Sequence, residues 1–296
     1  MKSLLGVKGL GRSDLETYLY RASAWRDAIE AKTPTAPVLD GVTVANVFFE
    51  PSTRTRLSFD LAASRLGANV ITYQPETSSA LKGESLRDTV LTISSLGTDI
   101  LVVRHHEDGI PQSVAEWTGS AVVNAGDGTN EHPTQALIDA LTLSRHFGDL
   151  EGLRVGIVGD ISHSRVAGSL VHAFPALGID VTLLAPGEWL PEHPELPVSD
   201  DLDSMLGDFD VVYLLRVQTE RGGVIDADYV SRFRLDARRA ARLGADTVVM
   251  HPGPMNRGVE LSEEVAESPR SLVLEQVRNG VPVRMAVLET LAGSLR

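Results

Sequence analysis

An α/β fold with two similar-sized domains, each a parallel sheet flanked by helices and the two joined by a bridging helix, is the architecture that this sequence predicts. Strand-like apolar runs alternate with helical patterns along almost the whole chain, which is typical of βαβ units. The chain has 296 residues, a length that indicates about two domains. A long helical stretch at 134–147 lies between the two alternating regions, so we expect it to bridge the domains.

The first half of the chain is expected to hold one parallel sheet. Leucines that recur at near-helical spacing, Leu57, Leu61 and Leu66, predict one of its helices. In such a sheet the functional site lies at the carboxyl ends of the strands, and Arg104 falls at one of these ends. The expected strands are 42–49, 69–73, 99–104 and 121–124, and the expected helices lie near 55–66, 85–96 and 110–117.

The second half is expected to hold another sheet, which begins with the apolar run at 153–160. The prolines between 186 and 197 predict an irregular, exposed loop. The stretch Pro282–Leu295 predicts a terminal helix. Further strands are expected at 181–185, 211–215 and 247–250.

The composition disfavours several classes of function. The formal net charge of -13 argues against nucleic acid as a partner, because that binding depends on Lys and Arg neutralising phosphates. The chain has no Cys, which excludes disulfides, thiol nucleophiles and thiolate metal sites and fits a cytoplasmic protein. No apolar run has membrane-spanning length, and Lys8 interrupts the first apolar stretch, so we expect neither a membrane anchor nor a secretory signal.

The most informative segment is the string Ser52-Thr53-Arg54-Thr55. It follows an apolar strand pattern and precedes a helical one, so Ser52 falls where a helix N-cap belongs. Backbone N–H groups, the positive end of the helix dipole and the Arg54 guanidinium then meet at one point, which is how proteins hold a phosphate. The alternative is an ordinary strand-to-helix turn with a capping serine and solvated arginines. The full string favours phosphate binding.

Further segments accompany this string along nearly the whole chain. They are Lys82-Gly83-Glu84-Ser85, Val103-Arg104-His105, Asn124-Ala125-Gly126-Asp127-Gly128, His132-Pro133-Thr134-Gln135, Gly159-Asp160 with Ser164-Arg165, Arg216-Val217-Gln218 and His251-Pro252-Gly253-Pro254. In composition and order they resemble the aspartate/ornithine carbamoyltransferase family. Ornithine-specific members are expected to carry His-Cys-Leu-Pro where this chain has His251-Pro252-Gly253-Pro254, so the resemblance is to the aspartate-specific members.

This resemblance implies a reaction. The carbamoyl group of carbamoyl phosphate would pass to the amine of L-aspartate, giving N-carbamoyl-L-aspartate and phosphate in de novo pyrimidine synthesis. Positioning and electrostatic stabilisation suffice for this step, so we expect no metal, no cofactor and no covalent intermediate. Two alternatives stay open: a carbamoyltransferase for another amine, and a non-catalytic relative with a structural or regulatory role.

The resemblance also implies a carbamoyl phosphate site. Arg54 would stabilise charge on the leaving phosphate, and His132 would act with Arg104 and Thr55 on the carbonyl oxygen. Gln135 would contact the carbamoyl amino group. The full expected set is Ser52, Thr53, Arg54, Thr55, Ser78, Arg104, His132, Gln135, Gly253 and Pro254.

An aspartate site is implied in the same way. Arg165 and Arg216 would clamp the two carboxylates, and Gln218 would orient the substrate. Lys82, with Ser78 four residues before it, would enter the active site of the neighbouring subunit. The expected catalytic residues are therefore Arg54, Thr55, Lys82, Arg104 and His132.

Two acidic residues in these motifs have roles that the sequence leaves open. Glu50 and Asp160 either orient the site arginines or form structural ion pairs. Because the net charge is -13, anionic substrates require arginines gathered at one place, where they focus a positive potential whatever the total charge.

Domain boundaries and an assembly follow from the resemblance. Residues 1–133 would bind carbamoyl phosphate, 134–148 would form the linking helix, and 149–281 would bind aspartate. The C-terminal helix, 282–296, would pack back on the first domain. The loop around 186–198 is shorter than is usual in the family. Shared active sites imply a homotrimer in the cytoplasm, and larger assemblies with regulatory chains or dihydroorotase stay open.

Overall fold

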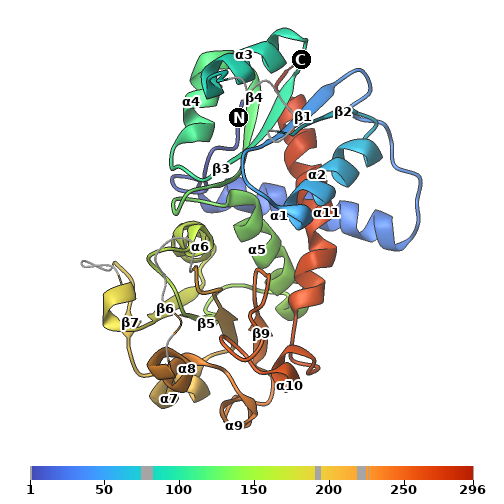
Figure 1. Ribbon diagram of the computed structural model, residues 1–296. Coiled ribbons are helices and arrows are strands. Elements are labelled where there is room, and N and C mark those ends of the chain that lie inside the picture. The colour runs from blue at the N-terminus through green and yellow to red at the C-terminus, as the bar shows by residue number, and fades with distance from the viewer. Residues whose placement is uncertain (1, 75–82, 191–194, 219–224, 226, 296) are drawn as a thin grey trace. The chain divides into compact units, whose positions relative to one another are not determined.

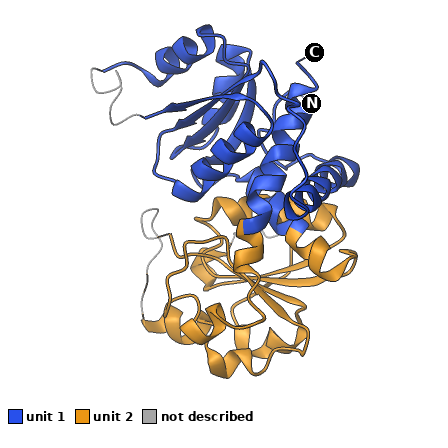
Figure 2. Cartoon of the chain, turned by 90° about the vertical axis from the view of Figure 1, so that its right-hand side faces the viewer, with its two compact units in different colours: residues 1–141, 278–296 blue, residues 142–277 orange. Residues whose placement is uncertain are grey.

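Two units make up the fold in the computed structural model, which describes residues 2–74, 83–190, 195–218, 225 and 227–295. Unit 1 comprises residues 1–141 with 278–296, and unit 2 comprises residues 142–277 (Figure 2). Each unit holds a parallel sheet flanked by helices, which confirms the predicted fold class (Figure 1). None of the described helices combines the length and the hydropathy that a membrane crossing needs.

A four-stranded parallel sheet forms the centre of unit 1. Its strands are β1 (Thr43–Phe48), β2 (Asn69–Tyr73), β3 (Ile100–His105) and β4 (Ala121–Asp127), in the order β2-β1-β3-β4. Helices α3 (Leu86–Ser95) and α4 (Ile110–Thr118) cover one face, where they pack on Ala45, Val47 and Leu101. Helix α2 (Thr53–Arg65) packs on the other face. This placement follows from Asn46, whose side chain points away from those of Ala45 and Val47 and donates to Asp60 Oδ1 on α2 over 2.6 Å.

Helix α1 (Arg12–Glu30) is absent from the elements that the sequence predicts. Its buried side chains, Leu15, Tyr18, Leu19 and Ala22, recur at helical spacing, so the signal is present in the sequence. The other positions are largely polar or charged, which leaves the apolar stripe narrow and easy to overlook.

Helix α11 (Val273–Ala292) begins earlier than predicted. The sequence predicts a helix that starts at Pro282, but Pro282 lies inside α11. A proline within a helix removes one backbone hydrogen bond. Packing around it offsets this loss: Asn279, buried one turn earlier, accepts a hydrogen bond of 2.9 Å from Arg26 Nη1 on α1.

Helix α2 forms where it is predicted, but two of the leucines that predict it face outward. Leu57 is 56% exposed and Leu61 is 46% exposed. The buried face of the helix is made by smaller or aromatic side chains, Phe59, Ala62 and Ala63. The helical spacing of the leucines therefore predicts the helix correctly, but the face of the helix that packs on the core is not the face that carries Leu57 and Leu61.

Unit 2 is built on a five-stranded parallel sheet. Its strands are β5 (Arg154–Val158), β6 (Asp180–Leu184), β7 (Val198–Ser199), β8 (Val211–Leu214) and β9 (Val248–Met250), in the order β7-β6-β5-β8-β9. The remaining helices and turns are α5 (Pro133–Phe147), which spans the boundary between the units, α6 (Arg165–Ala176), η3 (Gly187–Trp189), α7 (Leu202–Met205), η4 (Leu206–Asp208), α8 (Ala227–Phe233), α9 (Ala237–Ala240) and α10 (Glu263–Ala266).

The proline-rich segment after β6 is more ordered than predicted over its described part. The 3₁₀ turn η3 places Trp189 in the core, and β7 pairs with β6 as an edge strand. Residues 191–194, within the predicted irregular loop, lie outside the described residues.

Candidate active site

Both sheets have a point at which the direction of the chain connections reverses. In unit 1, β1 lies between β2 and β3, and in unit 2, β5 lies between β6 and β8. Open parallel sheets bind ligands at the carboxyl ends of the strands at such a point. The loops after β1 and β5 lead to Ser52 and Arg165, and the neighbouring strands β3 and β8 lead to Arg104 and Arg216.

Ser52 occupies the N-cap position of α2, but its hydroxyl caps none of the described backbone N–H groups of that helix. Serines at two other helix starts do cap: Ser85 Oγ accepts from the N–H of Asp88 over 3.1 Å, and Ser164 Oγ caps α6. The first turn of α2 also contains no acidic residue. The dipole and the N–H groups of this helix end are therefore not neutralised by its own side chains, which suits an anion.

The rest of the predicted phosphate string lies in the first turn of α2. Thr53 and Arg54 are exposed, Ser52 is half-buried and Thr55 is buried. The Ser58 hydroxyl, one turn further along α2, donates to the carbonyl of Arg54 over 2.8 Å. This hydrogen bond stabilises the first turn of the helix. The structure thus brings the predicted string together at one helix start.

Arg104 is fixed at the end of β3 by groups from two neighbouring strand ends. Its Nε lies 2.7 Å from Glu50 Oε1, and its Nη1 donates to the carbonyl of Ala125 over 3.0 Å. Both charged side chains are mostly buried. Of the two roles that the sequence leaves open for Glu50, the structure supports orientation of an arginine, because the guanidinium is held in place from both sides.

The loop between β4 and α5 is organised by two buried carboxylates. Asp127 accepts hydrogen bonds from the N–H of Gly109 (2.7 Å) and from the N–H of Glu131 (3.2 Å). Glu131 in turn accepts from the N–H of Val7 over 2.6 Å, which ties the start of the chain to this loop. No role is predicted from the sequence for either residue, although Asp127 lies within one of the quoted motifs.

His132 and Gln135 follow this loop at the start of α5. His132 is buried, and its carbonyl accepts a hydrogen bond of 2.9 Å from the N–H of Gln135. The Gln135 side chain donates to Asp139 Oδ1 over 2.9 Å. The two predicted residues therefore share one helix start in unit 1, with the Gln135 amide oriented by a buried aspartate.

In unit 2, Asp160 connects the loops after β5 and β8. This fully buried carboxylate accepts the N–H of Gln218 on Oδ2 (2.9 Å) and lies 2.6 Å from His163 Nδ1 on Oδ1. Arg165 is buried at the first position of α6, and Arg216 is half-buried after β8. Asp160 therefore holds the loop that carries the predicted aspartate residues, a role in addition to the two that the sequence leaves open for it.

The loop after β9 is held by a second buried carboxylate, Glu260. Its Oε1 accepts from the N–H of Val217 over 3.0 Å, and its Oε2 accepts from the N–H of Asn256 over 2.6 Å. Within the same loop, His251 Nδ1 accepts from the N–H of Gly253 over 2.8 Å. Glu260 therefore links the loops after β8 and β9, a role that no local sequence signal indicates.

Two predicted site residues cannot be placed. Ser78 and Lys82 lie in the segment 75–82, outside the described residues. Their assignment stays a prediction from the resemblance.

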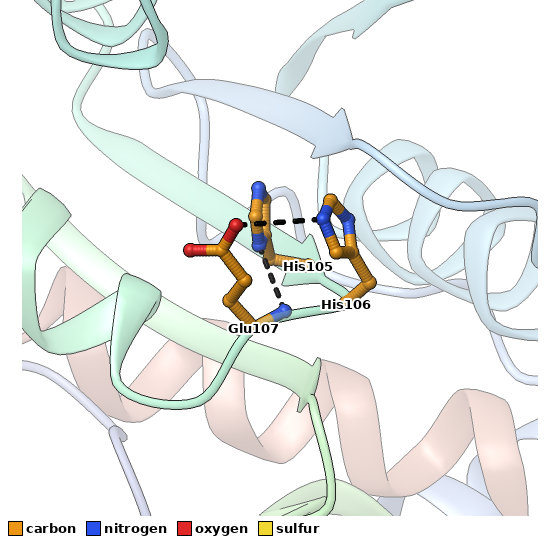
Figure 3. Close-up of side chains that lie close together, drawn as sticks. All are labelled: His105, His106 and Glu107. Atoms are coloured by element: carbon orange, nitrogen blue, oxygen red, sulfur yellow. Dashed lines mark hydrogen bonds and ion pairs between the residues drawn. The ribbon is translucent and has the colours of Figure 1, made fainter. Parts of the chain in front are cut away.

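Directly after Arg104 come three side chains whose potential ligand atoms lie within 4.8 Å of one another: His105, His106 and Glu107 (Figure 3). The two imidazole rings stack with centroids 4.2 Å apart and planes 22° apart. Lone pairs of imidazole lie in the ring plane, so nearly parallel rings do not aim at one ion. Burial lowers the pKa of His105, and the His106 ring lowers it further, which fits a neutral ring accepting the Glu107 N–H over 3.0 Å.

The two sheets, with polar residues gathered at their switch points, define an α/β protein built for anionic ligands. Residues 2–145 match the family model described as "Aspartate/ornithine carbamoyltransferase, carbamoyl-P binding domain", and residues 151–291 match "Aspartate/ornithine carbamoyltransferase, Asp/Orn binding domain". The chain belongs to the aspartate/ornithine carbamoyltransferase family, which confirms the resemblance seen in the sequence.

Individual relatives cover almost the whole chain. The aspartate carbamoyltransferase catalytic subunit of Acidothermus cellulolyticus is 50% identical, over 99% of this chain and 93% of that protein. The solved aspartate transcarbamoylase of Trypanosoma cruzi, in complex with carbamoyl phosphate and aspartate, has a TM-score of 0.87 and 30% identity, covering 98% of this chain and 96% of that one. The catalytic subunit of M. jannaschii aspartate transcarbamoylase has a TM-score of 0.86 and 35% identity, covering 99% of both chains.

The contrast between the N-cap serines Ser52 and Ser85 gives a stability prediction. Ser85→Ala should lower the free energy of unfolding by about 1 kcal/mol, because it removes a capping hydroxyl. Ser52→Ala should change it by less than about 0.5 kcal/mol, because this hydroxyl caps no described N–H group of its helix. Urea denaturation of both variants measures the difference. Equal losses would assign the Ser52 hydroxyl to the fold and not to a ligand.

Proposed function

We propose that the chain transfers the carbamoyl group of carbamoyl phosphate to the amine of L-aspartate. It is an enzyme, and its products are N-carbamoyl-L-aspartate and phosphate, a step of de novo pyrimidine synthesis. The similarity that carries this proposal is the 50% identity, over 99% of the chain, to a protein named as an aspartate carbamoyltransferase catalytic subunit. A carbamoyltransferase for another amine is less well supported, since Arg216 and Gln218 suit a carboxylate better than a cation.

The start of α2 is proposed to hold the phosphate of carbamoyl phosphate. Ser52, Thr53, Arg54 and Thr55 supply hydroxyls, backbone N–H groups and a guanidinium at one helix end, where the dipole favours an anion. As the C–O bond to phosphate breaks, negative charge grows on the departing group, and Arg54 is proposed to stabilise it. Support comes from the first turn, which has no acidic side chain to compete.

The carbamoyl group is proposed to lie against Arg104, His132 and Gln135. The Glu50 carboxylate and the Ala125 carbonyl already hold the Arg104 guanidinium, so this donor would need little rearrangement as charge develops on the carbonyl oxygen. His132 would share that oxygen, and Gln135 would contact the carbamoyl amino group. The backbone of Gly253 and Pro254 would meet the same group.

Aspartate is proposed to bind through Arg165, Arg216, Gln218 and Lys82. Each arginine can form a bidentate pair with a carboxylate, and aspartate brings two carboxylates. Asp160 supports this assignment because it fixes the backbone of Gln218. The α-amine must be neutral when it attacks the carbonyl carbon, and it must approach from outside the plane of the carbonyl group, so orientation is the main task of these contacts.

The division of labour between domains is part of the proposal. Residues 1–133 would form the carbamoyl-phosphate-binding domain, with the helix that ends the chain, 282–296, packed on it. Residues 134–148 would form the linking helix, and residues 149–281 the aspartate-binding domain. The organisation of each sheet around its own switch point supports two separate binding sites.

A homotrimer in the cytoplasm, with active sites shared between subunits, is proposed as the functional unit. An exposed apolar surface on α2 supports it, where Leu57 and Leu61 lie one turn apart, and Ile71 on the edge strand β2 is also 39% exposed, on the other face of the sheet. Such a surface and an open strand edge favour a partner chain. Ser78 and Lys82 lie outside the described residues, so their entry into a neighbouring site is proposed from the resemblance alone. Regulatory chains or dihydroorotase as further partners stay open.

Comparing two acceptors tests the reaction directly. The purified protein, given carbamoyl phosphate, should release phosphate and form a carbamoylated product with aspartate but not with ornithine, because the clamp residues are arginines. Phosphate assay and mass spectrometry of the product measure both. Turnover with ornithine alone would reassign the acceptor. Tight binding of carbamoyl phosphate without turnover of either amine would favour the non-catalytic alternative.

Replacing Arg216 with Lys should separate the two substrates. Lysine cannot form the bidentate pair, so the KM for aspartate should rise about tenfold or more. Carbamoyl phosphate binding, measured by calorimetry, should stay near native. Arg232→Lys is a matched control, because Arg232 forms exposed ion pairs with Asp200 and Asp228 and should tolerate the change. Equal losses for both ligands would contradict the division between domains.

Mixing two inactive variants tests the shared site. Arg54→Ala and Lys82→Ala should each lower turnover about 100-fold or more, because each removes a charged donor from the proposed site. Hybrid trimers should regain activity, since some sites would combine an intact Arg54 from one chain with an intact Lys82 from its neighbour. Activity is measured after mass spectrometry verifies subunit exchange. No recovery would count against sharing of the site.

A further inference from the structure

One buried carboxylate in unit 2 joins a histidine to the loop that carries Gln218. Asp160 is fully buried, and its two oxygens have different partners. Oδ2 accepts the backbone N–H of Gln218 over 2.9 Å, and Oδ1 lies 2.6 Å from His163 Nδ1. A single side chain thus connects the segment before Arg165 with the segment after β8.

The backbone around Asp160 is built for this connection. Gly159 has φ of +121°, a conformation that other residues rarely adopt, and a Cβ at this position would lie 3.1 Å from the carbonyl oxygen of Leu215. The same Cβ would lie 3.0 Å from the Tyr229 hydroxyl. Glycine therefore lets the loop after β5 approach the end of β8, which brings the Asp160 carboxylate to Gln218.

Hydrogen-bond chemistry fixes the role of the histidine. An ionised carboxylate only accepts hydrogen bonds, so in this contact His163 Nδ1–H donates a hydrogen bond to Asp160 Oδ1. A fully buried carboxylate needs such donors, because burying a charge without partners is costly. Asp160 has a donor on each oxygen, and losing the one from His163 would leave Oδ1 to find another by moving the side chain. That movement would pull on Gln218 through Oδ2.

We propose that His163 is a positioning residue for the aspartate side of the reaction. Its Nδ1–H holds Asp160, Asp160 holds the N–H of Gln218, and the geometry of the Arg216–Gln218 loop depends on both bonds. This inference rests on the proposed function, in which Arg165, Arg216 and Gln218 bind aspartate. It differs from a catalytic role, because His163 acts here through Asp160 and its other ring nitrogen has no part in the chemistry.

Two amide replacements distinguish the ring nitrogens. In His163→Asn the side-chain N–H₂ stands where Nδ1 stands, so it can still donate to Asp160. In His163→Gln the N–H₂ reaches the position of Nε2 instead. We expect the KM for aspartate to stay within about threefold of native for Asn and to rise about tenfold for Gln, the loss typical of one hydrogen bond to a charged group. Turnover at saturating aspartate should change less than KM in both.

Controls separate this inference from the proposed function and from folding. Carbamoyl phosphate binding by calorimetry should be the same for both variants, because the carbamoyl phosphate residues Ser52 to Thr55 lie in unit 1. Thermal unfolding should show that both variants are folded, with a lower melting temperature for His163→Gln, because the buried Asp160 then lacks one of its donors. His146→Gln, at an exposed histidine on α5, should leave the KM for aspartate unchanged. If the unmodified protein fails to carbamoylate aspartate, the proposed function fails, whatever the variants do.

Three outcomes would overturn the inference while leaving the proposed function intact. Native aspartate KM in both His163 variants would mean that the histidine has no role. Equal loss in Asn and Gln, with native carbamoyl phosphate binding, would mean that the Nδ1 bond is not what matters. A fall in turnover at saturating aspartate in both variants, with KM unchanged, would assign His163 a direct part in proton transfer.

Discussion

Buried carboxylates that accept backbone N–H groups are the constraint on which the candidate site depends. Asp127 holds the turn before His132 in unit 1, and Asp160 and Glu260 hold the loops of unit 2. A carboxylate in a protein interior costs several kcal/mol unless it is hydrogen-bonded. Each of these residues is therefore stable only while its loop keeps the observed conformation. The same hydrogen bonds therefore stabilise the fold and determine the geometry of the site.

These carboxylates also bear on how a chain with net charge -13 can use anionic substrates. Part of the negative charge is enclosed next to N–H groups that partly neutralise it, and Glu50 faces the Arg104 guanidinium. The first turn of α2 has no acidic side chain. Exposed acids elsewhere are screened by salt within about 10 Å. Local positive potential at the strand ends therefore need not follow the sign of the total charge.

Much of this architecture could be predicted from the sequence, because parallel strands are apolar runs and helices have a period. Contacts between residues that lie far apart in the sequence could not be predicted in this way. The bond between Asp160 and Gln218 joins residues 58 positions apart, and that between Val217 and Glu260 spans 43. Leu57 has helical spacing but lies outside, since burial depends on which face meets the sheet. Pro282 ends a helix by local rules, yet tertiary packing carries α11 through it.

The loop after β8 shows how far this constraint reaches. Consecutive backbone N–H groups there are held by different carboxylates: that of Val217 by Glu260, and that of Gln218 by Asp160. Asp160 comes from the end of β5, and Glu260 follows the loop after β9, so three neighbouring strand ends meet at this loop. Moving the loop after β8 would strain both hydrogen bonds, and moving either neighbouring strand end would strain one of them. Arg216, directly before these residues, therefore sits on backbone whose position is determined by the sheet rather than by the loop's own sequence.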